Sequence, residues 1–391
     1  MRRVGWLVGA IAVFGFGMAA CGDDSGSSTA TTAAPTTAGA PVTTSGSGPT
    51  TASPDTTAPA VQESLYYAAE GRIFRVVPGE APEALTDGPL NDQPAPSPDG
   101  GHLAFIRLEK EGDTAGELWI ANADGSDAHL LVPVGVSLDP AASDGEPAAA
   151  FRPSWSPDSS TIAYMPTIGL DGGDLQLVDP DTETVSSPDP TVWVSSYAWA
   201  HDSASIVFVS GTNDVSPVDI GVLDIESLDT STLVEATAAY GGVAVSPTGS
   251  EVIFVNSDLP LPPEGDGGFA LSKPGLYSVG LEGGEPTTVA PDPDPDDYRW
   301  GVRDSAKCLW YARQFAEGTG EVLLHRLCTG DPEPATPVTD LALFPALPAV
   351  SASNAIAYLV EGDDQSLFVL TAPDAEPLQI DEGVTAFAWT A

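Results

Sequence analysis

Positive charge is scarce in this chain of 391 residues. It holds 13 lysines and arginines against 56 aspartates and glutamates, which gives a formal net charge of −43 at pH 7. Binding to nucleic-acid phosphates requires a basic face, and an anionic bilayer repels a chain of this charge. We therefore expect no nucleic-acid partner, and any attachment to a membrane has to come from something other than electrostatic attraction.

Histidine is also scarce, and the local motifs of hydrolases and nucleotide-binding proteins are missing. The sequence has four histidines, none of them in a His-Glu-x-x-His pair, and it has no Gly-x-Ser-x-Gly motif. No lysine follows a phosphate-binding glycine-rich loop. We therefore predict no catalytic residue, no metal site and no cofactor, and we interpret the protein as a non-enzyme. The histidines, which we expect at turns or on the surface, are His102, His129, His201 and His325.

The apolar run near the N-terminus is too short for a membrane span, which takes about 20 residues as a helix. It covers residues 4–17, follows two arginines and leads into Met18–Cys21. This order is typical of a secretory signal, and Met18–Cys21 resembles the lipobox of bacterial lipoproteins. We predict that residues 1–20 are a lipoprotein signal peptide and that Cys21 is lipidated, so that the exported, extracytoplasmic protein is held to the bacterial cell membrane through its lipid only. An ordinary cleaved signal or an uncleaved anchor is the alternative.

Large apolar residues are almost missing between Ser25 and Ala60. In this stretch 34 of 36 residues are Ser, Thr, Ala, Pro or Gly. Such a segment cannot bury enough apolar surface to offset the entropy that it would lose on ordering. We predict that residues 21–60 are a disordered linker that begins at the lipidated cysteine, and that residues 61–391 form the folded domain.

Cysteine is rare as well, with three residues in the chain. If Cys21 carries the lipid, Cys308 and Cys328 remain, and both lie on strands that we expect to be neighbours. An antiparallel register that pairs these two cysteines also pairs Arg313 with Leu323, and this leaves an ordinary hairpin loop between the strands. An exported protein meets oxidising conditions. We therefore predict a disulfide between Cys308 and Cys328.

The chain does contain an internal repeat. Pro153–Asp158 is followed by the apolar strand Ile162–Tyr164, and versions of this pair recur from residue 94 to the C-terminus. Each copy has a turn rich in Ser, Pro, Asp or Gly and then an aromatic residue seven or eight positions after a reference residue. The reference residues are Ser97, Ser156, Ala200, Ser246, Val302 and Ser351, and the aromatics are Phe105, Tyr164, Phe208, Phe254, Trp310 and Tyr358. Four short strands in each copy predict a β-propeller.

The two ends of the domain each hold part of one more copy. Phe387–Thr390 matches the first strand of a copy, with no partner strand after it. Leu65–Ala68 matches the second strand, Arg72–Val77 the third and Glu83–Thr86 the fourth. Joining these segments would close a ring and remove exposed sheet edges. The fold class that we predict is all-β, a seven-bladed β-propeller closed by strands from both termini.

These repeats resemble the TolB-like, WD40-like (PD40) propeller family, whose blades carry a Pro-x-Trp-Ser-Pro-Asp-Gly turn followed by an Ile-Ala-Phe strand. The resemblance is carried by Pro153–Asp158 with Ile162–Tyr164 and by the turn Pro98–Gly101, and it covers residues 63–391. Three of the copies depart from the turn sequence. Members of this family include periplasmic envelope proteins and the propellers of prolyl-peptidases, so the resemblance implies a recognition scaffold and no particular activity.

Loop lengths differ between the two faces of the predicted ring. The turns between first and second strands, and between third and fourth, are short, whereas Pro133–Ala150, Asn256–Lys273 and Pro291–Asp297 belong to the other face. Long loops in compact folds are usually either functional or disordered. We therefore expect the binding surface on the long-loop face, with loop drift and no ligand as the alternative.

Aromatic residues and arginines stand near the starts of the first strands on that face, where they would surround the central opening. Such side chains suit a cationic, peptide or carbohydrate ligand, or they simply pack between blades. The candidate ligand-binding residues are Phe151, Arg152, Trp193, Tyr240, Tyr298, Arg299, Trp300 and Phe344.

A lipid tether and a repeat scaffold without a catalytic set favour a non-enzymatic recognition protein. Its partner would be a protein, a peptide or an envelope polymer bound on the long-loop face. A propeller hydrolase or lyase acting on extracytoplasmic glycan or peptide is an alternative, and a structural spacer of the envelope is another.

Overall fold

A computed structural model gives the fold of residues 63–390. The described residues exclude 89, 136–147, 168–172, 189–191, 211–217, 238, 247–248, 257–274, 290–296, 306, 315–321, 329, 332–333, 344–345, 361, 363 and 373–374. The chain divides into two compact units, residues 21–62 and the remainder, and every described residue belongs to the second unit. The predicted signal peptide and linker therefore lie outside the described residues, and so does most of each of the three long loops.

The described part of the chain is built from β-strands alone, and it contains no helix that could cross a membrane. Its first repeat unit combines the two ends of the domain in a four-stranded sheet of order β3-β2-β1-β30. Leu65 of β1 pairs with Trp389 of β30, and Tyr67 pairs with Phe387. The strands are β1 (Leu65–Ala69), β2 (Arg72–Val76), β3 (Glu83–Ala84) and β30 (Val384–Trp389).

The next two repeat units share one eight-stranded sheet, because Gly116 of β6 pairs with Ala150 of β8. The strands of the β4–β7 unit are β4 (Asn91–Pro96), β5 (His102–Leu108), β6 (Gly116–Asn122) and β7 (His129–Val132). Those of the β8–β12 unit are β8 (Ala149–Trp155), β9 (Ile162–Thr167), β11 (Gln176–Asp179) and β12 (Thr184–Ser186), while the short β10 (Gly173–Asp174) pairs with the sheet that follows.

Four further repeat units complete the described fold, and one sheet is formed by each. The β13–β16 unit holds β13 (Trp193–Trp199), β14 (Ser205–Ser210), β15 (Val218–Asp224) and β16 (Thr230–Thr237), and the β17–β20 unit holds β17 (Ala239–Val245), β18 (Glu251–Asn256), β19 (Gly275–Gly280) and β20 (Thr287–Thr288). The β21–β24 unit holds β21 (Asp297–Arg303), β22 (Leu309–Gln314), β23 (Val322–Leu327) and β24 (Ala335–Val338), and the last holds β25 (Leu341–Ala342), β26 (Ala349–Val350), β27 (Ile356–Val360), β28 (Ser366–Leu370) and β29 (Leu378–Glu382).

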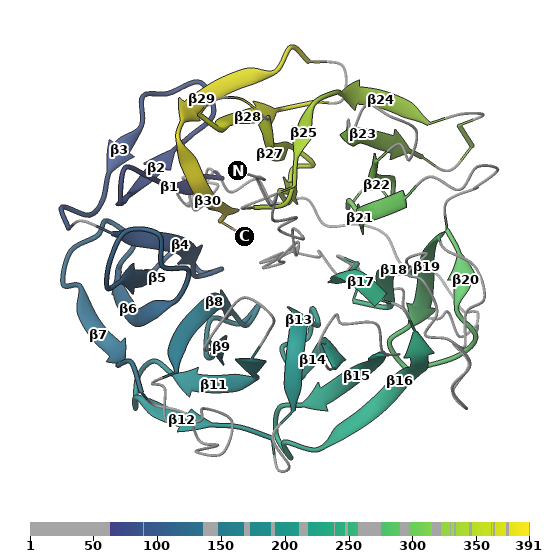
Figure 1. Cartoon of the computed structure of the whole chain (residues 1–391), viewed down its shortest axis with the longest axis horizontal. Coiled ribbons are helices and arrows are strands. Elements are labelled where there is room, and N and C mark those ends of the chain that lie inside the picture. Colours follow the sequence, from purple (N-terminus) through teal and green to yellow (C-terminus); the bar gives the residue numbers. More distant parts are fainter. Residues whose placement is uncertain are drawn as a thin grey trace, which may run out of the picture. The chain divides into compact units, whose positions relative to one another are not determined.

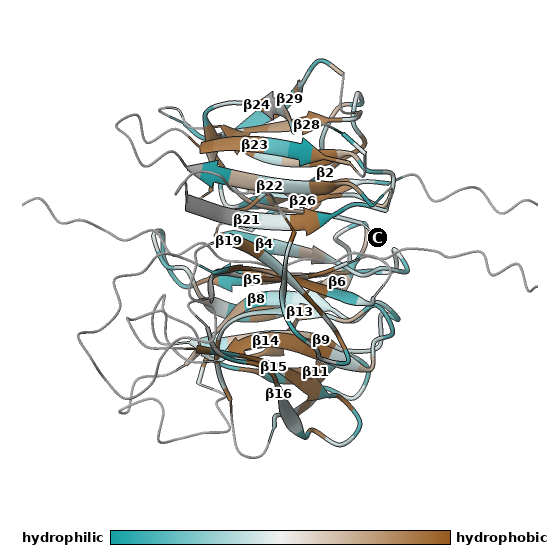
Figure 2. Ribbon diagram, turned by 90° about the vertical axis from the view of Figure 1, so that its right-hand side faces the viewer, coloured by the Kyte–Doolittle hydropathy of each residue, from teal (hydrophilic) through white to brown (hydrophobic). Residues whose placement is uncertain are grey.

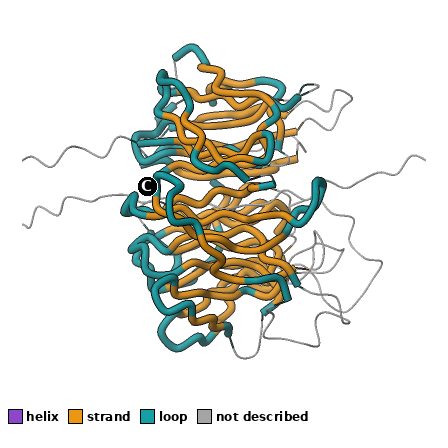
Figure 3. Tube along the Cα trace, turned by 90° about the vertical axis from the view of Figure 1, so that its left-hand side faces the viewer, coloured by secondary structure: helices purple, strands orange, loops and turns teal. Residues whose placement is uncertain are grey.

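The sheets stand around a common axis, and Figure 1 shows β4, β8, β13, β17, β21 and β30 as the strands nearest to it. In the side view of Figure 2 the hydrophobic residues lie mainly on strands, and the connecting turns are mainly hydrophilic. Figure 3, which is coloured by secondary structure, shows the strands and the loops that connect them from the opposite side. The inner strands are therefore the part of the fold that lies nearest to this axis.

The repeated Ser-Pro-Asp sequence forms a tight turn between the first two strands of a unit. Ser97 accepts a hydrogen bond from His102 N through Oγ, at 2.8 Å, and its hydroxyl donates to Asp99. Gly100 N donates to Ser97 O at 2.9 Å, and Gly100 has φ = 70°, a value that glycine adopts without strain. The serine and the aspartate of the motif therefore serve turn formation, as the sequence indicated.

The turn of the β21–β24 unit corrects the predicted alignment at its fifth copy. Asp304 N bonds to Cys308 O, four residues on, whereas Ser97 N bonds to His102 O, five residues on. Because this turn is one residue shorter, the residue that corresponds to the motif serine is Asp304. The predicted reference residue, Val302, lies two positions before it. The aromatic that corresponds to Phe105 is then Tyr311, because Tyr311 follows Cys308 by three residues, as Phe105 follows His102.

Neighbouring repeat units are joined by the motif tryptophans. Trp155 donates its indole N–H to Ala95 O at 2.9 Å, and Trp199 donates to Ser154 O at 3.1 Å. Trp389 makes the same bond to Ala349 O at 3.0 Å. Each tryptophan thus bonds to the inner strand of the preceding unit.

The turns of neighbouring units are also hydrogen-bonded to one another. Asp99 N donates to Ser159 Oγ at 3.0 Å, and Asp158 N donates to Ser203 Oγ at 2.9 Å. In the same way Ser305 N donates to Asn354 Oδ1 at 3.0 Å. These bonds link the turns of three pairs of neighbouring units.

The aromatic residue of the second strand packs against the third strand of its own unit. Tyr67 stacks on Phe74 with ring centroids 5.2 Å apart, and Phe254 stacks on Tyr277 at 5.9 Å. In the β13–β16 unit Phe208 lies over Gly221, where a Cβ would stand 2.3 Å from the ring. The ring therefore fills the space that a side chain at residue 221 would need.

Candidate ligand site at the inner strands

The inner strands carry β-bulges at corresponding positions. The pairing register shifts between Asp92 and Ala95 on β4, between Phe151 and Ser154 on β8, and between Val194 and Ser196 on β13. A bulge adds an unpaired residue and turns its side chain in a new direction. The side chains at these bulges are therefore candidates for contact with a ligand at the inner strands.

Two of the bulged residues have a strained backbone. Gln93 has φ = 50° and Arg152 has φ = 53°, values that are uncommon for residues with a side chain. Both stand four positions before the serine of their motif, Ser97 and Ser156. Strained backbone that the surrounding structure maintains is often found at functional sites.

Hydrogen bonds connect the bulges of four units in a line that we call the polar row, formed by Thr385, Asp92, Gln93, Arg152 and Ser195. Thr385 donates its hydroxyl proton to Asp92 Oδ1 at 2.9 Å, and Gln93 N donates to the same oxygen at 2.8 Å. Gln93 Oε1 accepts from Arg152 N at 2.7 Å. Arg152 Nη1 then donates to Ser195 O at 2.8 Å.

Asp92 is the acidic group of the polar row. It is half-buried, and Thr385 beside it is exposed. Burial raises the pKa of Asp92 above its usual value of 3.8, although the hydrogen bonds from Gln93 N and Thr385 act in the opposite direction. The carboxyl group therefore keeps its proton to a higher pH than a solvent-exposed aspartate does.

Arg152 is the basic group of the polar row, and it is 5% exposed. Its guanidinium lies over the Phe151 ring at 4.5 Å from the centroid, and its carbonyl oxygen accepts a hydrogen bond from the Tyr197 hydroxyl. Burial lowers the pKa of Arg152, while the nearby Tyr197 acts to raise it. No carboxylate among the described residues forms an ion pair with this guanidinium.

Of the predicted ligand-binding residues, the structure brings Phe151 and Arg152 together at this site. Trp193 stands at the start of β13 and is partly exposed. Trp300 is fully buried in a core cluster with Val302 and Trp310, which is the inter-blade packing role that we kept as the alternative. Tyr240 lies on β17, and Tyr298 and Arg299 lie on β21. The side chains of these three residues are outside the described part of the structure, and Phe344 is outside it altogether.

Sequence reasoning missed Asp92, Gln93 and Thr385. For Gln93 the repeat contained a signal, because Gln93 precedes Ser97 by the same number of residues as Arg152 precedes Ser156.

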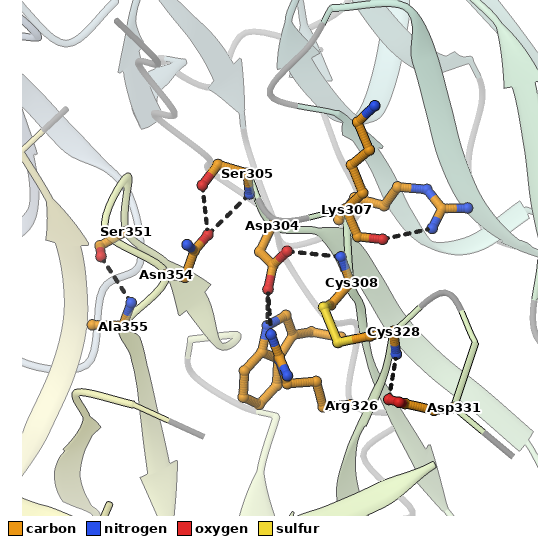
Figure 4. Close-up of polar contacts among 12 residues, drawn as sticks. Asp304, Ser305, Lys307, Cys308, Arg326, Cys328, Asp331, Ser351, Asn354 and Ala355 are labelled. Carbon is orange, nitrogen blue, oxygen red and sulfur yellow. Dashed lines mark hydrogen bonds and ion pairs between the residues drawn. A yellow bond between two sulfur atoms is a disulfide. The ribbon is translucent and has the colours of Figure 1, made fainter. Parts of the chain in front are cut away.

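A second polar cluster lies in the β21–β24 unit, and Figure 4 shows it beside the disulfide. Asp304 accepts hydrogen bonds from Cys308 N at 2.8 Å and from Trp310 Nε1 at 3.1 Å. Arg326 Nη2 forms an ion pair with Asp304 Oδ2 at 3.4 Å, and the Asp304 side chain has no exposed surface. A carboxylate with its partners on all sides in this way is a structural group.

The predicted disulfide between Cys308 and Cys328 is present, with Cα atoms 4.1 Å apart. The predicted register is also confirmed, because Arg313 pairs with Leu323. The disulfide therefore joins β22 and β23 at the end of their hairpin that lies next to Asp304.

The histidines are not gathered in one place, but one of them corrects the prediction for the group. His325 is buried, at 6% exposure, and stacks on Tyr311 with ring centroids 5.1 Å apart. Burial and the nearby Arg313 lower the pKa of His325 to about 4. It is a neutral core residue at physiological pH, since the third strand places it opposite the repeated aromatic. Among the described residues no cluster of His, Cys, Asp and Glu has the geometry of a metal site.

No family model and no curated protein matches this chain. Solved structures do match. The tricorn protease is 13% identical over 83% of this chain and 34% of its own, with a TM-score of 0.58, so this chain spans about a third of that protein. An oligogalacturonate lyase in complex with manganese is 13% identical over 74% of this chain and 76% of its own, with a TM-score of 0.53. The β-propeller domain of the Trilobed protease from Pyrococcus furiosus is 17% identical over 82% of this chain and 94% of its own, with a TM-score of 0.52.

These likenesses establish a β-propeller fold, as the repeat predicted. They also correct the interpretation of the chain as a non-enzyme, because the proteins with this fold include a protease and a lyase. The reason is physical: a ring of repeat units brings residues that are far apart in the sequence to one axis. A propeller enzyme therefore does not need the local motifs whose absence supported the earlier interpretation.

Proposed function

We propose that this chain is an exported, lipid-anchored propeller enzyme, a hydrolase or lyase that binds an extracytoplasmic peptide or glycan at its polar row. The observation that carries the proposal is the polar row itself, in which Thr385, Asp92, Gln93 and Arg152 come from the inner strands of three units. A half-buried aspartate on an inner strand is the type of group that general acid–base catalysis uses.

The proposal includes a ring of seven blades with TolB-like repeats, closed where β30 pairs with β1. Support comes from the antiparallel pairing of these strands over Leu65–Ala69. Further support comes from Thr390, which follows the position of the motif tryptophan and accepts a hydrogen bond from Ser64 N at 2.9 Å, as the serine does in a complete copy. Six continuous copies and this divided one make seven.

We further propose that the domain works outside the cytoplasm on a lipid anchor at Cys21. The disulfide between Cys308 and Cys328 is typical of proteins from oxidising compartments. The lipobox-like Met18–Cys21 supplies the site of attachment. The anchored protein would meet its substrate at the cell surface.

Replacing Cys21 by alanine is expected to abolish incorporation of a labelled fatty acid and to release the protein from the membrane fraction. The reason is that the thiol of Cys21 is the acceptor of the lipid, and no other cysteine is available once the disulfide has formed. The measurement is metabolic labelling with an alkyne fatty acid followed by fractionation. Label that persists on the Cys21→Ala protein would rule out this anchor.

Replacing Asp92 by asparagine is expected to stabilise the fold at neutral pH while it abolishes turnover. Because the pKa of Asp92 is raised in the folded protein, ionisation of this group disfavours the folded state as the pH rises from 3.8 through the folded-state pKa. Asparagine removes this penalty. The gain in stability over the parent protein should therefore be present at pH 7 and disappear below pH 3.8.

Two measurements check this prediction, urea unfolding from pH 3 to pH 8 and release of new amino groups or unsaturated sugar ends from digests of cell-envelope material. The matched control is Asp99→Asn, which should leave turnover unchanged. Asp99 lies beyond the opposite end of β4, in the turn to β5. Full activity in the Asp92→Asn protein would refute the role of Asp92, and an inactive parent protein on both classes of substrate would refute the proposed function.

A further inference from the structure

The buried guanidinium of Arg152 has fewer partners than a charged group of this kind needs. Arg152 Nη1 donates to Ser195 O at 2.8 Å, and Arg152 Nε is buried with no hydrogen-bond partner among the described residues. Its guanidinium carbon also lies 4.5 Å from the centroid of the Phe151 ring. A carbonyl oxygen and a ring face stabilise the cation, but they do not balance its charge.

This absence of an ion pair distinguishes Arg152 from the arginines that have carboxylate partners. Arg303 is paired with Glu251 at 2.6 Å, Arg75 with Glu83 at 2.6 Å, and the partly buried Arg326 with Asp304 at 3.4 Å. None of the acidic side chains that the structure describes forms an ion pair with Arg152. A buried charge without a partner is strongly unfavourable, and buried charges in proteins are normally paired. An anion from outside the described residues would supply the missing partner, and a bound ligand can bring one.

We propose that Arg152 binds a carboxylate of the ligand, and that this ligand is a peptide with a free carboxyl group. The inference rests on the proposed function, because it assigns the substrate class of the polar row. Arginine suits this role, since its planar head group can offer two parallel N–H donors to the two oxygens of a carboxylate.

The charge of the protein favours a peptide over an acidic glycan. A polyuronate carries a negative charge on each sugar, and a chain with a net charge of −43 would repel it along its length. A peptide brings one carboxylate to Arg152, and its amide N–H groups are donors. Asp92 belongs to the same polar row, in the neighbouring unit. Its Oδ1 atom accepts the hydrogen bonds from Gln93 N and Thr385, so its Oδ2 atom can accept a hydrogen bond from a peptide N–H.

The test compares a carboxylate with its amide on the full exported domain. The probes are N-acetyl trialanine with a free carboxyl terminus, the same peptide as its C-terminal amide, D-glucuronate and inorganic phosphate. Isothermal titration is expected to show the free acid binding at least tenfold more tightly than the amide, and more tightly than glucuronate or phosphate. In the parent protein the ¹⁵Nε–¹H signal of Arg152 should shift with the acid and not with the amide.

Two variants complete the test. Arg152→Met is expected to reduce affinity for the acid to that of the amide without lowering Tm, because methionine fills an apolar site and removes an unpaired charge. Arg152→Lys should lose most of the preference, since lysine offers a point charge in place of two parallel donors. The matched control is Arg72→Met, where an exposed arginine paired with Glu70 is replaced and affinity should not change.

Equal affinities for acid and amide, or an Arg152 signal that the acid does not move, would overturn this inference and leave the proposed function standing. Binding of neither the peptides nor glucuronate would overturn both. Tighter binding of glucuronate or phosphate than of the acid would contradict the assignment to a peptide. Because the signal of Arg152 is read in the parent protein, the test does not depend on the folding of any variant.

Discussion

Replacing Asp304 by alanine is expected to lower the free energy of unfolding by about 3 to 5 kcal/mol, the range for breaking a buried ion pair by removal of one partner. The carboxylate has no exposed surface, and Arg326 opposite it is 19% exposed. The change also leaves Cys308 N and Trp310 Nε1 without their acceptor. Urea unfolding at pH 7, followed by tryptophan fluorescence, measures the loss.

The control for this variant is Ser351→Ala, which removes the corresponding turn side chain from the next unit. Ser351 Oγ accepts from Ala355 N at 3.1 Å and has no charge to balance, so a loss of about 1 kcal/mol is expected. Asp304→Asn should fall between the two variants, because the amide oxygen still accepts from Cys308 N while the charge of Arg326 is left unpaired. Equal losses for all three variants would mean that the ion pair contributes nothing of its own.

Removing the disulfide by the double change Cys308→Ala and Cys328→Ala is expected to lower the free energy of unfolding by about 2 to 4 kcal/mol. The two cysteines are 20 residues apart in sequence, and the bond between them restricts the unfolded chain. Chemical denaturation of the double variant and of the parent protein, with and without dithiothreitol, measures the effect. The parent protein in dithiothreitol should approach the double variant, and a parent protein that dithiothreitol does not affect would contradict the prediction.

The losses from Asp304→Ala and from the double cysteine change should not add. Cys308 N is a donor to Asp304 Oδ1, and the disulfide holds Cys308 in the turn that presents this N–H. Residues that share a hydrogen-bond network show interaction energies of about 0.5 to 3 kcal/mol in double-mutant cycles. A combined variant whose loss is smaller than the sum is therefore the expected result.

The sequence allowed the strands and the disulfide to be predicted because their determinants are local or repeated. Apolar residues around Phe105 and Phe208 predicted buried strands, and the register through Cys308 and Cys328 followed from the length of one hairpin. The fifth copy was misaligned because its turn is one residue shorter, and Val302 has the same spacing to Trp310 as Ser97 has to Phe105. An alignment by spacing could not detect the shorter turn, because Trp310 next to Tyr311 is also aromatic and has the expected spacing.

The candidate site was harder to predict, since it depends on which residues the ring brings to its axis. Phe151 and Arg152 were found because aromatic and arginine side chains near strand starts were sought. Asp92 is about 60 residues away from Arg152 in sequence, and only the closing of adjacent units through Gln93 connects them. The same dependence on the ring explains why the absence of local catalytic motifs led to a wrong interpretation.

The tryptophan bonds between units have a consequence for how such a chain can change over evolutionary time. The acceptors at Ala95, Ser154 and Ala349 are backbone carbonyl oxygens, which are present whichever side chain occupies those positions. A substitution there leaves the acceptor in place, so one unit can drift without a matching change in its neighbour. Units held together in this way can therefore diverge in sequence at the acceptor positions and still assemble.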